Sequence, residues 1–464
     1  MTLVTLLAVV MAGATFSIAT VTPSADPDTY WHLASAKWMV EHGQLLTRDP
    51  YSSTATGAPY GLGEWLGQLV WYAAYLLDGW QGIVVLRALL VAVFAFFATR
   101  VTLLVQPRPA VALVPLLAAL GISKTTWTDR PQLFTLALFA LFLFVLLRAH
   151  LGLGSRALWL LPPLLLLWTN LHGGYAIGLA LVGLFLVAAV IERRPFSRTL
   201  FAVLVLGAGA SALDPESFGA LSAAGHAANP PRFIAEELPP DVFTPQGATF
   251  AVLLVAALAA AIVAGGKERL WPILLVPLVW LGLSAQRHLP LAALPLAAFV
   301  AAFAPRAFTA VAPSLPPLAP IGERRLRPGV GLSFAVVIIL LALLAASVAP
   351  AKPDVSPYPA GVVPALRDAP RELLNEYDWG GFLIWNAPEH PVFVDGRLLP
   401  FLPEVLADYR AATELRPNFR EVIARRHVEA VLLRPSRPLA VFLRESGWLV
   451  RAEDPGRYVL LVRP

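Results

Sequence analysis

Long apolar segments recur along the chain, and they limit its fold more than any other feature. A helix needs roughly 17–25 mainly apolar residues to cross the hydrocarbon core of a bilayer. Segments of about that length are predicted at 3–22, 80–99, 109–123, 131–148, 157–171, 174–191, 199–213, 248–265, 270–285, 288–304 and 332–350. We therefore expect an α-helical polytopic membrane protein with about eleven transmembrane helices.

Composition supports a bilayer as the main solvent. Of the 464 residues, 57% are hydrophobic and 14% are charged, whereas a soluble domain carries about 25% charged residues. The net charge of +5 is spread thinly, so no nucleic-acid partner is expected. The chain has no cysteine, which excludes disulfides, thiolate catalysis and Cys-ligated metals.

Two apolar segments need separate interpretation. No Lys or Arg precedes residues 3–22, so the cationic region of a signal peptide is missing and a retained first helix is expected. Trp65–Leu77 is short for a span, and we predict an interfacial or re-entrant segment.

Loop charges predict the topology. Every second loop carries cations: Arg100, Arg108, Arg148, Arg156, Arg193, Arg194, Arg198, Lys267, Arg269, Arg306, Arg324, Arg325 and Arg327. The intervening loops hold most of the acids: Asp26, Asp28, Glu64, Asp129, Asp214, Glu236, Glu237 and Asp241. The positive-inside rule places the cationic loops in the cytoplasm, so we expect a cytoplasmic N-terminus and an external C-terminal tail.

The pattern changes after residue 350. Short apolar runs predict strands at Phe382–Trp385, Val392–Val394, Ala430–Leu433 and Tyr458–Val462. Helical patterns occur at Glu404–Glu414, Asn418–Arg426 and Leu439–Glu445. The sequence thus predicts a transmembrane domain at 1–350 and a small extracytoplasmic α/β domain at 351–464.

The first external loop, residues 23–64, has the most informative chemistry. Asp26 precedes Pro27, which predicts a helix that starts there with Asp26 as its N-cap. Asp28 then lies in the first helical turn, where a negative charge is favourable. Either acid could instead be a general base at the membrane surface, and the sequence leaves both roles open.

Other polar residues gather at the external ends of the predicted spans: Lys124, Asp129, Arg130, Asn170, His172, Asp214, Glu236, Glu237, Asp241, Arg287 and His288. Each alone could be a solvated loop residue, whereas together they suit a lipid-linked phosphate and an acceptor hydroxyl. Arg87 lies within a predicted span, so it needs a partner or must snorkel to the surface. Asp26 and Asp28 could share a hard divalent cation with Glu236 or Glu237.

Several strings resemble the GT-C superfamily of membrane glycosyltransferases. They are Asp26-Pro-Asp28-Thr-Tyr-Trp-His, Asp49-Pro-Tyr-Ser, Glu64-Trp-Leu, Arg130-Pro-Gln, Asn170-Leu-His172-Gly-Gly and Arg287-His288-Leu-Pro. In the tail, Tyr377-Asp-Trp-Gly-Gly-Phe-Leu-Ile-Trp385 and Val394-Asp-Gly-Arg397 are similar to a bacterial, largely uncharacterised subgroup.

The resemblance implies a GT-C-like fold in the bacterial inner (plasma) membrane. It implies inverting transfer of a sugar from a polyprenyl-phosphate carrier to an extracytoplasmic lipid, glycan or protein of the cell envelope. Asp28, with Asp26 second, would be the catalytic base or metal ligand. The candidate cofactor is Mg²⁺ or Mn²⁺ on Asp28 and Glu236. The candidate substrate-binding residues are Glu64, Asp129, Arg130, His172, Arg287 and His288.

Three alternatives stay open. Tyr377-Asp378-Trp379-Gly380 resembles the peptide-acceptor motif of oligosaccharyltransferases, with Glu376 in place of the leading Trp, or it packs aromatics in a core. The protein could be a transporter or flippase of lipid-linked sugars, which favours polar residues near the bilayer midplane. It could also be a non-catalytic membrane assembly protein, in which Asp28 would be dispensable.

Overall fold

The structure is a computed structural model that describes residues 1–217, 234–264, 268–311 and 326–464. Lys267, Arg324 and Arg325, which the sequence assigns to cytoplasmic loops, lie outside the described residues. Contacts divide the chain into two compact units. We call residues 1–22 with 84–350 the membrane unit, and residues 23–83 with 351–464 the loop–tail unit.

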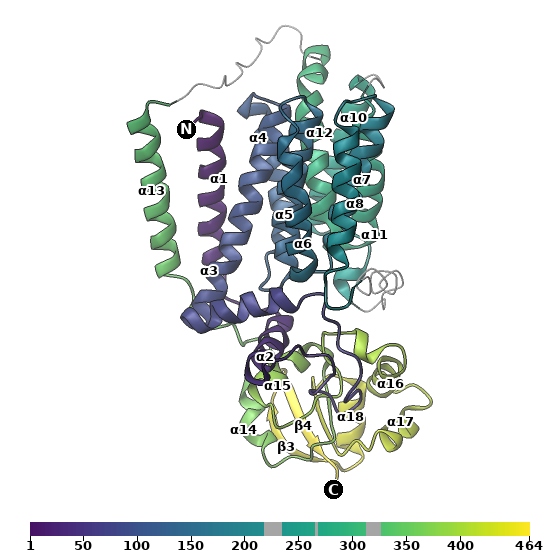
Figure 1. The fold of residues 1–464 in the computed structure, drawn as a ribbon. Coiled ribbons are helices and arrows are strands. Elements are labelled where there is room, and N and C mark those ends of the chain that lie inside the picture. Colours follow the sequence, from purple (N-terminus) through teal and green to yellow (C-terminus); the bar gives the residue numbers. More distant parts are fainter. Residues whose placement is uncertain (218–233, 265–267, 312–325) are drawn as a thin grey trace. The chain divides into compact units, whose positions relative to one another are not determined.

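The membrane unit is built from apolar helices (Figure 1). They are α1 (Leu3–Thr20), the second part of α3 (Trp65–Val105), α4 (Pro109–Ser123), α5 (Gln132–His150), α6 (Leu161–Leu171), α7 (Tyr175–Ile191), α8 (Ser197–Ser211), α10 (Pro245–Ala264), α11 (Leu270–Ser284), α12 (Leu289–Val311) and α13 (Pro328–Ser347). Each predicted span overlaps one of these helices. The predicted helices are thus confirmed, because an apolar segment of this length satisfies its own backbone only as a helix.

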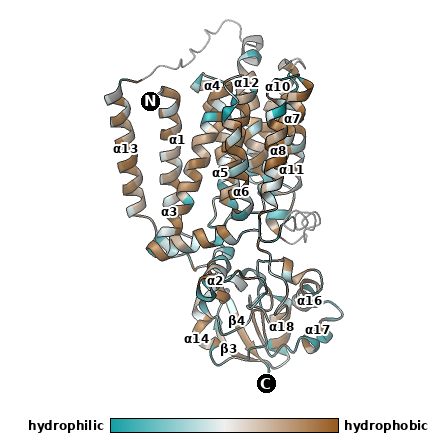
Figure 2. Ribbon diagram, in the orientation of Figure 1, coloured by the Kyte–Doolittle hydropathy of each residue, from teal (hydrophilic) through white to brown (hydrophobic). Residues whose placement is uncertain are grey.

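Seven helices of the described chain are long and apolar enough to cross a membrane. Three shorter apolar helices, α7, α8 and α11, accompany them. Figure 2 shows hydrophobic residues along most of the length of these helices. The chain is therefore an integral membrane protein, while the number of helices that cross the bilayer stays a prediction.

A break inside α3 separates two helical segments. Asp78 (φ −154°, ψ 31°) and Gly79 (φ 56°, ψ −140°) leave the helical region. Gly79 suits this break because its positive φ is costly for residues with a Cβ. The break follows directly after Trp65–Leu77, so the predicted interfacial segment is a separate helical segment, and its depth in the membrane stays a prediction.

The loop–tail unit contains a four-stranded sheet of order β1-β2-β4-β3. Its strands are β1 (Leu373–Asn375), β2 (Ala430–Leu433), β3 (Leu449–Asp454) and β4 (Tyr458–Val462). β1 pairs with β2 in parallel, and the other two pairs are antiparallel. The accompanying helices are α2 (Pro27–His42), α14 (Val363–Leu366), α15 (Gly380–Asn386), α16 (Glu404–Thr413), α17 (Phe419–Arg425) and α18 (Pro438–Glu445).

The predicted α/β character of the tail is confirmed, but two predicted strands are wrong. Phe382–Trp385 lies inside helix α15. Val392–Val394 makes only an isolated bridge, between Val392 and Ser52. Short apolar runs do not distinguish a strand from a buried helical turn by periodicity, and the sequence also gave no sign of β1 or β3.

The first external loop contributes to the core around the sheet. Tyr30 of α2 is 2% exposed. The centroid of its ring lies 5.3 Å from the ring centroid of Tyr358 and 5.4 Å from that of Phe382, and both pairs have an edge-to-face (T-shaped) arrangement. The loop and the tail thus share one core. The predicted domain boundaries, 1–350 and 351–464, stay a prediction, because contact units do not by themselves define folding domains.

Candidate functional site

Helix α2 fixes the two acids of the first loop in different roles. Asp26 is the N-cap, and its Oδ1 accepts the backbone N–H of Asp28 at 2.9 Å. Pro27 occupies the first helical turn, and Gly43 (φ 64°) ends the helix. The predicted cap is confirmed. Asp28 is consequently placed in the first turn, where the helix dipole favours its charged form.

Asp28 is half-buried, and its carboxylate contacts an indole and a backbone turn. Its Oδ1 accepts the Trp31 Nε1–H at 2.9 Å. Gly396 lies against the same oxygen, since an alanine Cβ there would stand only 2.0 Å from Oδ1. The carboxylate is therefore held in place on a residue that is partly exposed.

Glu64 lies near the same helix. Its Oε2 is 3.7 Å from Nδ1 of His32. The His32 ring contacts the Trp31 ring at a tilted angle of 35°, with 3.6 Å between centroids. Gln68 Nε2 lies 3.3 Å from His32 Nδ1 and donates to the Tyr60 hydroxyl at 3.3 Å. Burial raises the pKa of Tyr60 to about 12, so its hydroxyl stays protonated at neutral pH. Glu64 therefore shares the loop–tail unit with Asp28, in a neighbouring polar network.

A buried ion cluster joins two strings to which the sequence assigned no role. Arg397 binds Asp49 Oδ1 at 2.5 Å and both oxygens of Asp395 at 2.7 and 2.5 Å. Arg397 and Asp49 are 348 residues apart in the chain, and all three side chains are at most 3% exposed. Burial alone would lower the pKa of Arg397, but Asp395 and Asp49 outweigh it and raise the pKa above its usual range. We call Asp49, Asp395 and Arg397 the buried triad.

In the membrane unit, two arginines pair with two glutamates. Arg130 donates to Glu236 from Nη2 at 2.8 Å and from Nη1 at 3.4 Å. Arg287 forms an ion pair with Glu237. The backbone N–H of Gln286 donates to Leu238 O at 2.9 Å, which holds the two loops together. We call Arg130, Glu236, Glu237 and Arg287 the arginine–glutamate cluster.

The two glutamates of this cluster have opposite pKa shifts. Burial favours the neutral form of Glu236, but Arg130 and Arg287 outweigh it and lower the pKa of Glu236. For Glu237, burial dominates and raises the pKa, with Arg287 acting against it and Glu236 adding to it.

His172 is neutral beside these cations. Burial, then Arg287 and Arg130, lower the pKa of His172 to about 3. Its Nδ1 accepts the Gly174 N–H at 2.9 Å and lies 2.8 Å from the Thr135 hydroxyl. Because Nδ1 accepts, the proton of the neutral ring is on Nε2. His172 thus suits binding rather than acid catalysis at neutral pH.

Asp129 has a buried partner from the adjacent helix. Arg87 Nη1 lies 3.0 Å from Asp129 Oδ2, and the two side chains are 3% and 1% exposed. Arg87 also donates to the carbonyls of Ala19 (3.0 Å) and Thr22 at the end of α1. The intramembrane Arg therefore has the partner that its position demands, and these contacts favour a structural role for Asp129.

His288 follows Arg287 in the short 3₁₀ turn η4 (Gln286–His288). The six candidate substrate-binding residues are thus split: Glu64 is in the loop–tail unit, and Asp129, Arg130, His172, Arg287 and His288 are in the membrane unit.

No group of three or more His, Asp or Glu side chains among the described residues is arranged to hold a metal ion. Glu236 is engaged by Arg130, and Asp28 belongs to the other unit. A divalent cofactor on Asp28 and Glu236 therefore stays a prediction.

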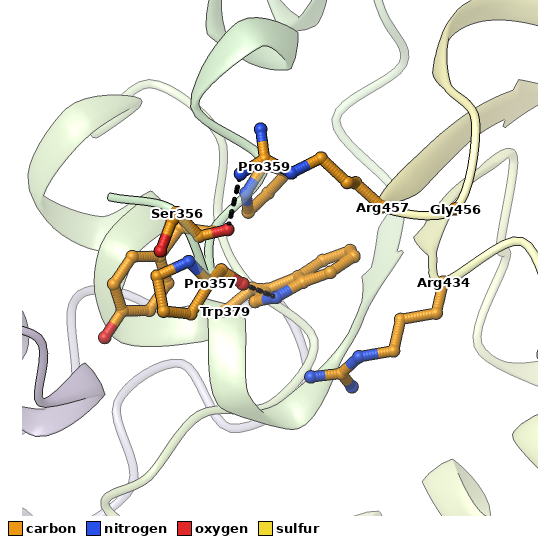
Figure 3. Close-up of a pocket in the computed structure, with 8 residues that line it drawn as sticks. Ser356, Pro357, Pro359, Trp379, Arg434, Gly456 and Arg457 are labelled. Carbon is orange, nitrogen blue, oxygen red and sulfur yellow. Dashed lines mark hydrogen bonds between the residues drawn. The ribbon is translucent and has the colours of Figure 1, made fainter. Parts of the chain in front are cut away.

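A cavity of about 170 Å³ in the loop–tail unit is lined by Trp379, one residue of the possible acceptor motif (Figure 3). Trp379 Nε1 donates to Pro357 O at 3.1 Å, and Arg457 Nη2 donates to Ser356 O at 2.9 Å. Arg434 covers the Trp379 ring at 5.2 Å and pairs with Glu376 and Asp378. Trp379 is only 2% exposed, which favours aromatic packing over acceptor binding for this motif.

No family model and no curated protein matches the chain. Among solved structures, the apo oligosaccharyltransferase of Archaeoglobus fulgidus aligns with a TM-score of 0.53 and 13% identity over 93% of this chain and 69% of that chain. The same enzyme, tethered to an acceptor peptide with the NVT sequon, gives a TM-score of 0.51 and 12% identity over the same shares of the two chains. The archaeal oligosaccharyltransferase AglB of Archaeoglobus fulgidus, in complex with an inhibitory peptide and a dolichol-phosphate, gives a TM-score of 0.52 and 13% identity over the same shares of the two chains. At this identity the likeness shows the fold, and the chain has a GT-C-like membrane fold.

Proposed function

We propose that the protein is a GT-C-type glycosyltransferase that moves a sugar from a polyprenyl-phosphate carrier to an extracytoplasmic acceptor. The observation that carries the proposal is the Asp28 carboxylate, half-buried in the first turn of α2 and held by Trp31. The likeness to an oligosaccharyltransferase solved with a dolichol-phosphate supports a lipid-linked donor.

Asp28 would act as the general base. Its carboxylate takes the proton of an acceptor hydroxyl, the acceptor oxygen bonds to the anomeric carbon, and the bond to the carrier phosphate breaks with inversion. Proton transfer of this kind needs a base at about 2.6–3.2 Å from the hydroxyl. Asp26 is the second candidate, because its carboxylate is the N-cap at which α2 starts.

Arg130 and Arg287 are the proposed binders of the donor phosphate. Guanidinium groups match phosphate oxygens in charge and geometry, and stabilising the leaving charge lowers the barrier. Both arginines bind glutamates here, so a phosphate must replace or join a carboxylate. His172 and His288 would border this anion, with His172 neutral at physiological pH.

A divalent cation, Mg²⁺ or Mn²⁺, would add positive charge that stabilises the departing phosphate. Its candidate ligands are Asp28 and Glu236. Glu64 is the proposed contact to polar groups of a substrate near Asp28. The acceptor is a lipid, glycan or protein outside the cytoplasm, and the location is the bacterial inner membrane.

The test uses purified wild type, Asp28→Asn and Asp368→Asn, an exposed acid of the same unit. Each is incubated with a panel of polyprenyl-phosphate sugars, with and without Mg²⁺ or Mn²⁺, and release of polyprenyl phosphate is followed. We expect turnover by wild type and Asp368→Asn, and a loss of at least about 100-fold in folded Asp28→Asn.

Equal turnover by Asp28→Asn would move the base to another acid. Lipid binding without turnover by any variant would favour a transporter or an assembly protein.

A further inference from the structure

Position 396 needs a glycine because a side chain there would have no room, and not because of its backbone conformation. It is not among the described residues with a positive φ. An alanine Cβ there would lie 2.0 Å from Oδ1 and 3.1 Å from Cγ of Asp28, and 3.4 Å from Trp31 Nε1. Contacts below 3.0 Å force a shift, and the atom that must move is the Asp28 carboxylate.

The turn that carries Gly396 is anchored on both sides. Asp395 accepts the backbone N–H of Arg397 at 2.9 Å as well as its guanidinium. Arg397 then reaches Asp49 in the first loop, completing the buried triad. Moving this turn away from the Asp28 side chain would break the buried, charge-assisted hydrogen bonds of Arg397 to Asp395 and Asp49. The turn is therefore expected to stay in place.

Two further glycines bring helix α15 close to the same turn. A Cβ at Gly380 would lie 2.3 Å from Val394 O, and a Cβ at Gly381 would lie 2.4 Å from Pro27 O. The backbones of α15, of the turn and of the α2 N-terminus therefore approach one another without intervening side chains. This close approach sets the position of the first turn of α2 against the tail.

We infer that the Asp395-Gly396-Arg397 turn positions the Asp28 carboxylate, with Gly396 and Arg397 as positioning residues. The inference rests on the proposed function, and it makes the C-terminal tail a part of the catalytic centre. A carboxylate in a first helical turn has rotamer freedom. Trp31 donates to Oδ1, and the backbone at Gly396 lies so close to the same oxygen that this side of the carboxylate has no room to move. Catalytic groups need this precision, since a misplacement of about 1 Å costs roughly 100-fold in rate.

The test compares Gly396→Ala with Gly183→Ala, a glycine of α7 with open space around its Cβ position. For folded protein, we expect Gly396→Ala to lower kcat by about 10- to 100-fold with less than about threefold change in donor KM. The acidic limb of its pH–rate profile should shift, because the carboxylate has moved. Gly183→Ala should match wild type in all three quantities.

A stability cycle tests the contact without any activity. Gly396→Ala should lower the unfolding midpoint in the wild-type background and lower it less, or not at all, in the Asp28→Ala background. Equal effects in both backgrounds would overturn the contact on which the inference rests.

The two proposals fail in different ways. If Asp28→Asn is inactive while folded Gly396→Ala has the kcat of wild type, the positioning role is wrong and the proposed base stands. If Asp28→Asn is as active as wild type, the proposed base is wrong, whatever the stability cycle gives.

Discussion

At the scale of single residues, the buried triad has the largest expected effect on stability. Asp49 and Asp395 are fully buried, and both depend on the one guanidinium of Arg397. The Arg397 guanidinium also lies 5.2 Å from the Tyr51 ring. Without the guanidinium, the two buried carboxylates keep neutral hydrogen-bond donors, the backbone N–H groups of Tyr51 and Arg397 and the Ser52 hydroxyl, but lose the positive charge that pairs with them. Losing this charge costs far more than an exposed ion pair contributes.

We predict that Arg397→Met lowers the free energy of unfolding by about 3–5 kcal/mol. The measurement is denaturant unfolding in detergent. The control is Arg410→Met, which breaks an exposed pair with Glu414 and should change stability by no more than about 0.5 kcal/mol. Similar midpoints for the two variants would show that the triad contributes little.

His172 predicts how stability depends on pH. Its pKa is about 3 in the folded protein and about 6.5 in an unfolded chain. Between these values the unfolded chain binds a proton that the folded protein does not, so stability falls as the pH decreases from 6.5 toward 3. The loss approaches about 1.4 kcal/mol per pH unit.

We expect His172→Gln to reduce this loss, measured as the difference in thermal midpoint between pH 7.5 and 5.0. His42→Gln, an exposed histidine of α2, should leave the difference as in wild type. An unchanged difference in His172→Gln would show that folding does not lower the pKa of His172.

At the scale of elements, the junction of α2 and α15 depends on close backbone approach. The Gly381 Cβ position faces the Pro27 carbonyl at 2.4 Å, and the Gly396 Cβ position faces the end of a side chain. A backbone carbonyl cannot turn away without displacing its helix, whereas a carboxylate can rotate. Gly381→Ala should therefore displace a helix, whereas Gly396→Ala should rotate a side chain.

We predict that Gly381→Ala lowers the free energy of unfolding by about 1–3 kcal/mol, through displacement of α15 from α2. Gly183→Ala should be neutral or stabilising by up to about 1 kcal/mol, because alanine favours a helix interior over glycine. Denaturant unfolding of both variants provides the comparison. A neutral Gly381→Ala would show that α15 shifts freely.

At the scale of the whole molecule, the distribution of charge predicts which loops face the cytoplasm. The chain contains no cysteine, so a single introduced thiol reports its own location. Ser446 in the tail and Arg198 at the start of α8 are both exposed, and they belong to loops of opposite predicted side.

We expect Ser446→Cys to react with a membrane-impermeant maleimide in intact cells, and Arg198→Cys to react only after permeabilisation. The cysteine-free wild type gives the background. Labelling of Arg198→Cys in intact cells would reverse the predicted topology.

The sequence by itself determined the features that depend on nearby residues. Apolar length predicted the helices of the membrane unit, because a backbone in hydrocarbon must satisfy its own hydrogen bonds. Asp26-Pro27 predicted the start of α2, since a cap needs only its own first turn. In the tail, Ala430–Leu433 and Tyr458–Val462 are strands as predicted.

Only the tertiary structure decided which distant residues meet. It paired Asp49 with Arg397 and Arg130 with Glu236, and it set Gly396 against Asp28. Asp395 and Arg397 follow the apolar run at Val392–Val394, and this pattern indicates a buried charge. It does not indicate the distant partner, Asp49. The same apolar composition suits a strand or a buried helix, so α15 was decided by its packing on α2. Local sequence limits backbone conformation, whereas long-range contacts depend on the path of the whole chain.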